Sequence, residues 1–138
     1  MLIDRNTPAG GRALARLDDE IIIWLTTVTP GGQPQASPVW FWWDGEEFLV
    51  YSLPSPRVRN IEHNPKVALN LDGNGEGGDI VTIEGVARID ETAPPAHENP
   101  EYVAKYQRKL DQHGWTPEWF ASRYSVPLRI EPTRARYH

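Results

Sequence analysis

The stretch that decides the fold is "IIIWLTTVTPGGQPQASPVWFWWDGEEFLVYSL", residues 21–53. It is rich in β-branched and aromatic residues, and "PGGQ" (30–33) and "DGE" (44–46) interrupt it with turn-forming residues. Turns this short predict antiparallel strands joined as hairpins, over residues 21–29, 34–44 and 47–53. Because Pro38 cannot donate to a ladder, the second strand is expected at a sheet edge or a bulge.

The rest of the chain adds further strands and short helices around this core. Hydrophobic periodicity and capping residues predict helices over Gly11–Glu20, Ser55–Asn64, Glu101–Gly114 and Thr116–Ser125, and strands over 66–72, 79–90 and 126–138. Gly85 inside the second of these strands indicates a bulge. Short hairpin-linked strands favour an antiparallel barrel of about six strands, with helices at its ends, over βαβ units.

The chain has 138 residues, a length typical of one domain with a single core. We therefore expect residues 1–138 to form one domain. Within it, residues 1–20 would hold the N-terminal helix, 21–90 the barrel core, and 91–138 the later helices and the final strand.

Composition excludes several classes of function. The net charge is −5, which argues against nucleic acid and anionic membranes as partners. The chain has no cysteine, which rules out disulfides, a thiolate nucleophile and thiolate-bound metal. No apolar run approaches the roughly 20 residues of a membrane span, and the N-terminal residues lack the apolar region of a signal peptide. A cytoplasmic protein is therefore expected.

The segment "SLPSPRVRNIEHNP", residues 52–65, carries an unusual charge pattern. Ser55 suits an N-cap and Pro56 a first helical position. Arg57 and Arg59 then stand at the positive end of the helix dipole, where acidic residues are usual. Residues two apart do not share a helix face, so a solvated surface is one interpretation. The other is an anion site, made of helix N–H groups, the serine hydroxyl and guanidinium donors.

The run from Trp40 to Trp43 places aromatic side chains on both faces of its strand, because successive residues alternate. One interpretation is a core contact on one face and a contact with a second copy on the other. The alternative is an apolar wall for a planar ring system, which needs large rigid surfaces with a few polar groups.

The sequence contains no motif of catalytic or metal-binding residues beside the basic helix start and the aromatic strand. The four histidines, at 63, 97, 113 and 138, have no metal-ligand spacing. Ser37 lacks the context of a hydrolase nucleophile, and "GNGEGG" precedes a strand and opens no helix. We therefore name no catalytic residue and no metal ligand. A local phosphate site beside an aromatic strand suits a cofactor that brings its own reactivity.

The segment "GGQPQASPVWFWWDGEEFLVYSLPSPRVRNIEHNPKVALNL", residues 31–71, resembles the pyridoxamine 5′-phosphate oxidase-like, flavin-binding split-barrel superfamily. Within it, the chain is similar to the actinobacterial group that uses the deazaflavin coenzyme F-420. The resemblance extends from about Ile21 to the C-terminus. It implies a six-stranded split-barrel homodimer with two cofactor sites at the subunit interface.

The resemblance also implies which residues contact the cofactor. The phosphate would bind Ser55 and Arg57, with Arg59 and Asn60 close by; the ring would lie along Ser37, Pro38, Val39 and Trp40, with Tyr51 and Ser52 beside it. The C-terminal strand, including Arg134 and Tyr137, would reach the site from the partner subunit.

The implied function is hydride transfer from reduced F-420 to a small organic substrate. FMN is the alternative cofactor, for an oxidase or reductase on the same fold. A non-catalytic protein that binds or sequesters a flavin or deazaflavin is a second alternative. A barrel that binds nucleic acid is disfavoured by the acidic charge.

Overall fold

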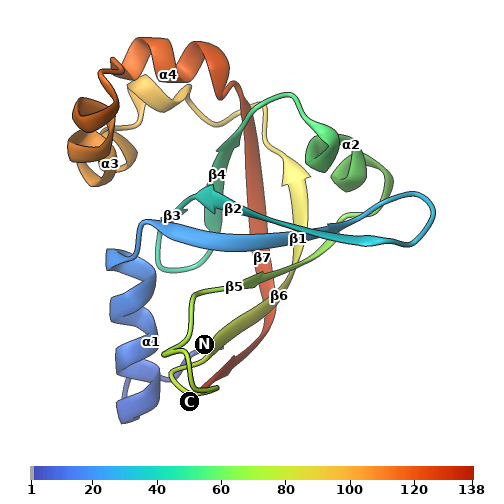
Figure 1. Ribbon diagram of the computed structural model, residues 1–138, viewed down its shortest axis with the longest axis vertical. Coiled ribbons are helices and arrows are strands. Elements are labelled where there is room, and N and C mark those ends of the chain that lie inside the picture. Colours follow the sequence, from blue (N-terminus) through green and yellow to red (C-terminus); the bar gives the residue numbers. More distant parts are fainter. Residues whose placement is uncertain (1) are drawn as a thin grey trace.

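The computed structural model describes residues 2–138. The chain forms one curled antiparallel sheet with helices around it (Figure 1). The strands are β1 (Ile22–Val28), β2 (Pro34–Trp40), β3 (Trp42–Trp43), β4 (Phe48–Ser52), β5 (Lys66–Asn70), β6 (Val81–Ile89) and β7 (Val126–Tyr137). The helices are α1 (Pro8–Asp19), α2 (Pro56–His63), α3 (Pro100–His113) and α4 (Pro117–Arg123), with a short 3₁₀ helix at Ala96–Glu98. The strand order is β2-β1-β5-β6-β7-β4-β3.

This architecture confirms the mostly-β antiparallel class and agrees with a split barrel. The sheet has seven strands in the described part of the chain, whereas the sequence predicted six. The difference arises in the run 34–44, which divides into β2 and β3 on either side of Phe41. The expected edge position of Pro38 is confirmed, because β2 stands at one end of the strand order, and β1 is its single neighbour among the described strands.

The division at Phe41 has a clear physical cause. β2 pairs with β1, whereas β3 pairs with β4, so the chain changes partners at this residue. The freed backbone groups are satisfied by α3. The Phe41 N–H donates to the Tyr106 hydroxyl at 2.7 Å, and the Phe41 carbonyl accepts from Lys105 Nζ at 2.9 Å. The Tyr106 hydroxyl also lies 2.7 Å from the Ile21 carbonyl oxygen. Side chains thus replace the missing ladder bonds.

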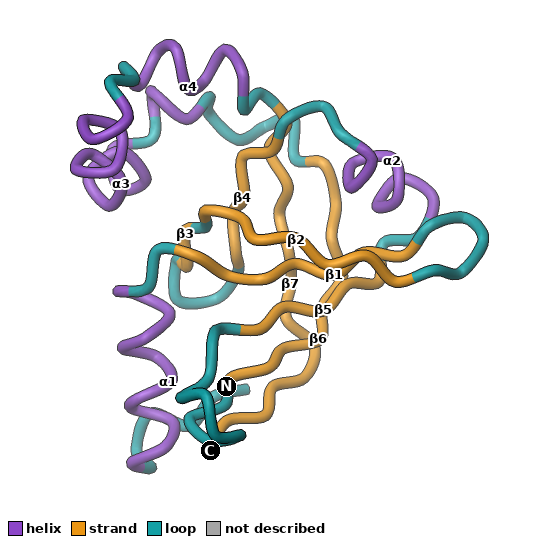
Figure 2. The backbone as a smooth tube through the Cα atoms, viewed as in Figure 1, coloured by secondary structure: helices purple, strands orange, loops and turns teal. Residues whose placement is uncertain are grey.

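Two hydrophobic clusters hold the sheet and helices together. The first fills the curled sheet and includes Phe41 and Trp43. The second lies between the sheet and helices α3 and α4, and Trp40 and Trp42 pack against it. The expected alternation of the aromatic run is therefore confirmed, and the second face packs against helices of the same chain. Figure 2 shows α3 and α4 together at one end of the sheet.

Helix α2 is fastened to the β1–β2 hairpin by a buried amide. Asn60 Nδ2 donates to Thr27 Oγ1 and to Gln35 Oε1, both at 3.0 Å. These two hydrogen bonds hold α2 against the β1–β2 hairpin, close to the end of β4 in the sequence. The expected bulge in β6 is also confirmed, between Glu84 and Gly85. A Cβ at Gly85 would lie 2.8 Å from the Glu131 carbonyl oxygen, so a side chain has no room there.

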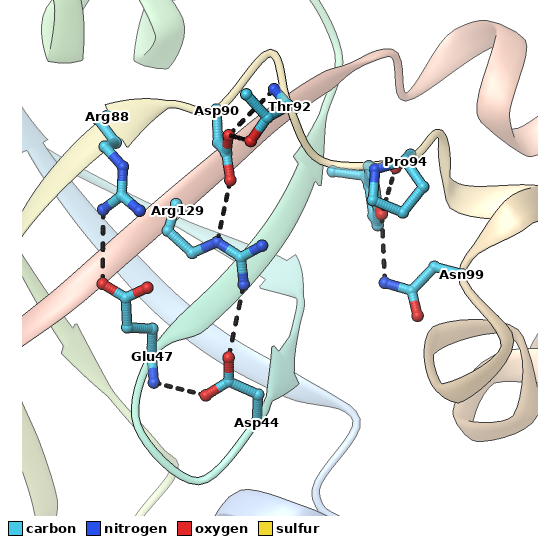
Figure 3. A network of polar contacts seen from close by, with 9 residues as sticks. Asp44, Glu47, Arg88, Asp90, Thr92, Pro94, Asn99 and Arg129 are labelled. Atoms are coloured by element: carbon cyan, nitrogen blue, oxygen red, sulfur yellow. Dashed lines mark hydrogen bonds and ion pairs between the residues drawn. The ribbon is translucent and has the colours of Figure 1, made fainter.

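An ion-pair network joins the β3–β4 turn to β7 (Figure 3). Arg129 Nε lies 3.3 Å from Asp90 Oδ2, and its Nη1 lies 3.5 Å from Asp44 Oδ2. Arg88 pairs with Glu47 at 3.4 Å. A hydrogen bond from Thr92 and the Arg129 contact lower the pKa of Asp90.

None of the helices within residues 2–138 combines the length and apolar character that a membrane span requires.

Candidate functional site

The site is built around Arg57, which stands at the start of α2 and reaches back to two strands. Its Nη1 donates to Ser52 Oγ, at the end of β4, at 3.1 Å. Its Nη2 donates to Ser37 Oγ, in β2, at 2.9 Å. The structure therefore brings together Ser37, Ser52 and Arg57, three of the residues that the sequence predicted.

Arg57 has no counter-ion among the described residues, although it is partly buried. Its Nε is buried and has no hydrogen-bond partner in that part of the chain. Burial lowers the pKa of Arg57, an effect that the charge of Tyr124 partly opposes. A cation removed from water is unfavourable unless an anion or hydrogen-bond acceptors compensate it. The guanidinium is therefore held in place by two hydroxyls, and its buried Nε–H is left without a partner in the described chain.

Ser55 provides a second unused polar group. It occupies the N-cap position of α2, as predicted, but its side chain makes no capping hydrogen bond. The backbone instead bends so that the Ser55 carbonyl accepts from the Val58 N–H at 3.0 Å. Its Oγ is buried and unpartnered within residues 2–138. An unused hydroxyl and a guanidinium without a counter-ion, both at a helix start, suit a bound oxyanion.

Two cavities meet at Arg57. The first, which we call the polar cavity, has a volume of about 220 Å³. It is lined by Thr27, Gln35, Ala36, Ser37, Ser55, Pro56 and Arg57. The second, the apolar cavity, has a volume of about 230 Å³. It is lined by Ile22, Pro38, Val39, Trp40, Tyr51, Leu53, Arg57, Phe120 and Tyr124.

Most of the predicted site residues line one of these cavities or contact Arg57. Arg59 and Asn60 do not: Arg59 is exposed, and Asn60 is buried in its contact with Thr27. Arg134 is exposed and lies along a separate groove over β5 and β6. The Tyr137 hydroxyl accepts from the Asp4 N–H at 2.9 Å.

Trp40 does not offer an open ring face to the apolar cavity. Its indole stacks on Tyr106 with centroids 4.5 Å apart and on Phe120 at 5.3 Å. Both faces are thus covered by rings from α3 and α4. Trp40 therefore lines the apolar cavity without an open ring face. The sequence had suggested a flat aromatic wall for a ring system as one of two interpretations.

Sequence reasoning missed the contribution of α4. Phe120 lies in that helix and Tyr124 at its end, and both line the apolar cavity. Their rings stack with centroids 4.3 Å apart and planes within 9°. The only sequence signal was the aromatic content of a short helix, which does not reveal that the chain returns to β2 and β4.

A larger cavity, of about 400 Å³, lies between α1 and the β3–β4 turn. It is lined mainly by apolar side chains, among them Ile3, Leu14 and Trp43, and by no arginine, lysine or histidine. The smaller pair at Arg57 therefore carries the chemistry expected of an anion site. A polar and an apolar cavity that share one cation fit a phosphate joined to a planar ring system by a side chain.

Comparisons with known proteins agree with this fold. The sequence profile of a family described as pyridoxamine 5′-phosphate oxidase matches residues 11–138. No curated protein sequence matches the chain.

Three solved structures share the fold. An F420 reductase is 25% identical, with 88% of this chain and 94% of that chain covered and a TM-score of 0.63. A FAD-binding protein from Mesorhizobium loti is 17% identical, with coverage of 92% and 90% and a TM-score of 0.65. The heme storage protein HutZ from Vibrio cholerae is 18% identical, with coverage of 92% and 92% and a TM-score of 0.63.

Proposed function

Because the chain belongs to the pyridoxamine 5′-phosphate oxidase family, we propose that it is an oxidoreductase that transfers hydride from reduced coenzyme F-420 to a small organic substrate. The observation that carries this proposal is the Arg57 guanidinium, which has no counter-ion among the described residues and an unpartnered Nε, together with the unused Ser55 hydroxyl. The choice of a deazaflavin is supported by the likeness to an F420 reductase. Hydride chemistry is what the bound deazaflavin supplies, and the protein supplies placement and electrostatics.

Each group near Arg57 has a defined role in this proposal. The Ser55 hydroxyl and Arg57 Nε donate to the cofactor phosphate in the polar cavity. The oxygens of Ser37 and Ser52 hold the guanidinium in position, at 2.9 Å and 3.1 Å. Binding of the phosphate therefore costs little side-chain conformational entropy. The ring occupies the apolar cavity along β2, from Pro38 to Trp40, beside Tyr51.

The proposed assembly is a homodimer with a cofactor site at each end of its interface. The second copy would complete the walls of the two cavities and exclude water from the ring. Arg134 and Tyr137 of the final strand remain the proposed contributions from the partner subunit.

Equilibrium titration with F-420 and with FMN tests the cofactor assignment. A charge-assisted hydrogen bond contributes about 1.5–3 kcal/mol, so Arg57→Ala should weaken binding about 10- to 100-fold. Arg59→Ala is the matched control, since Arg59 is exposed and lines neither cavity. We expect a much smaller effect from it, through charge alone. Thermal unfolding of both variants checks that each is folded.

Two outcomes would overturn this assignment. If the wild-type protein binds neither F-420 nor FMN at micromolar concentrations, the cofactor proposal is wrong. If Arg57→Ala changes the affinity no more than Arg59→Ala does, the arginine only holds the two serines together.

FMN is the second candidate, because both cofactors carry a phosphate on the side chain of a planar ring system. The absorption spectrum of the purified protein separates a flavin from a deazaflavin. A non-catalytic carrier would bind the cofactor yet reduce none of a panel of enones and quinones. Turnover with F-420 and not with FMN, or the reverse, identifies the cofactor that the enzyme uses.

A further inference from the structure

Tyr124 is the residue of α4's C-terminal end that faces the same cavity as Arg57. Its ring is held by stacking on Phe120, with centroids 4.3 Å apart. Phe120 in turn stacks on Trp40 at 5.3 Å. The phenol is therefore fixed by a column of aromatic rings at the cavity that Arg57 also lines.

The lining of the apolar cavity narrows the choice of a proton donor. Four of its side chains carry a proton on nitrogen or oxygen: Trp40, Tyr51, Arg57 and Tyr124. The Trp40 indole and the Arg57 guanidinium do not release a proton near neutral pH. The Tyr51 hydroxyl already donates to the Pro94 carbonyl at 2.7 Å, and burial raises its pKa. Of the two tyrosine hydroxyls in this lining, that of Tyr51 is hydrogen-bonded and that of Tyr124 makes no hydrogen bond within residues 2–138.

We propose that the Tyr124 phenol is the catalytic acid that protonates the substrate in the apolar cavity. This inference rests on the proposed function. It also defines the substrate as a polarised acceptor, such as an enone or a quinone, whose oxygen lies within reach of this hydroxyl.

The step balances in atoms and electrons. The substrate carbon gains a hydride, with its electron pair, from the C–H bond that breaks in the reduced deazaflavin. The π electrons of the substrate move onto its oxygen, which takes the proton from Tyr124 as the O–H bond breaks. The resulting phenolate lines the same cavity as the Arg57 cation and regains a proton from water, and the hydroxide that this leaves is neutralised by the N–H proton that oxidation of the deazaflavin would release. The substrate is reduced by two electrons and the cofactor is oxidised by two.

Tyr124→Phe removes this hydroxyl and keeps the ring that stacks on Phe120. We expect the affinity for F-420 to stay within about twofold of the wild-type value. General acid catalysis typically contributes 10²–10⁴-fold, so single-turnover reduction of the best acceptor from a panel of cyclic enones and quinones should slow by about 100-fold or more. Tyr102→Phe is the matched control, since Tyr102 lines neither cavity, and its rate should equal that of the wild type.

A second readout does not depend on turnover. With 2-cyclohexenone bound to the oxidised holoenzyme, infrared difference spectroscopy should show the carbonyl stretch lowered by a hydrogen bond in the wild type. We expect that shift to be absent in Tyr124→Phe and present in Tyr102→Phe.

The results separate the two proposals. If the wild-type protein reduces no acceptor, the proposed function is wrong and the role of Tyr124 is withdrawn with it. If the wild type turns over and Tyr124→Phe matches it in rate and in carbonyl stretch, only the role of Tyr124 is wrong. Loss of cofactor binding in Tyr124→Phe would reassign the hydroxyl to the cofactor.

Discussion

Tyr102 carries a phenol that is almost fully buried and has no hydrogen-bond partner in the described chain. Its ring packs well, edge-on to Tyr51 with centroids 4.8 Å apart and near Tyr106 at 4.9 Å. An unsatisfied buried hydroxyl costs about 1–3 kcal/mol. Tyr102→Phe should therefore raise the free energy of unfolding by about 1 kcal/mol, measured by urea denaturation. A clear decrease would show that the hydroxyl has a partner, such as a buried water.

Lys105 makes stability depend on pH in an unusual direction. Its Nζ lies 3.7 Å from the centroid of the Phe41 ring. Burial lowers the pKa of Lys105 to about 8, although Asp18, Asp19 and Glu20 oppose the shift. An unfolded lysine has a pKa of about 10.4, so between these values the unfolded chain binds more protons than the folded one. The contribution of Lys105 to the free energy of unfolding therefore rises as the pH increases from about 8 to about 10.4.

Lys105→Met removes the titrating group and most of the pH dependence with it. We expect the free energy of unfolding of the wild type, relative to this variant, to increase between about pH 8 and pH 9.5. Urea denaturation at several pH values measures the difference. A difference that stays constant with pH would contradict the lowered pKa.

At the scale of elements, the junction between β2 and β3 is satisfied by two side chains of α3, Lys105 and Tyr106. Tyr106→Phe leaves the buried Phe41 N–H without the acceptor that it contacts at 2.7 Å. Loss of that partner should lower the free energy of unfolding by about 1–3 kcal/mol. The same substitution four residues earlier, at Tyr102, should have the opposite sign. Equal effects in both variants would contradict the hydrogen-bond assignments.

Most elements could be predicted from local sequence, and this junction could not. Gly85 marked its bulge and the turns at 30–33 and 44–46 marked the hairpins, because those signals are local. The break at Phe41 is set by Lys105 and Tyr106, more than sixty positions later in the chain. Alternation alone predicted a single strand there, since both halves of the run keep the same period.

At the scale of the whole molecule, the site joins segments that are far apart in sequence. Family resemblance predicted Ser55 and Arg57, and caps predicted where α2 begins. The sequence did not reveal that Ser55 Oγ and Arg57 Nε lack partners, because this depends on how β2 and β4 meet α2. Nor did it reveal Tyr124, which reaches the cavity only because α4 packs against Trp40.

The central claim is that Arg57 and Ser55 hold the phosphate of the cofactor. The most direct test compares the affinities of FMN and riboflavin, which differ only in that phosphate, for the wild type and Arg57→Ala. We expect the wild type to prefer FMN by about tenfold or more and the variant to lose most of that preference, with its riboflavin affinity unchanged. Equal binding of FMN and riboflavin by the wild type, or equal weakening of both by Arg57→Ala, would contradict the account.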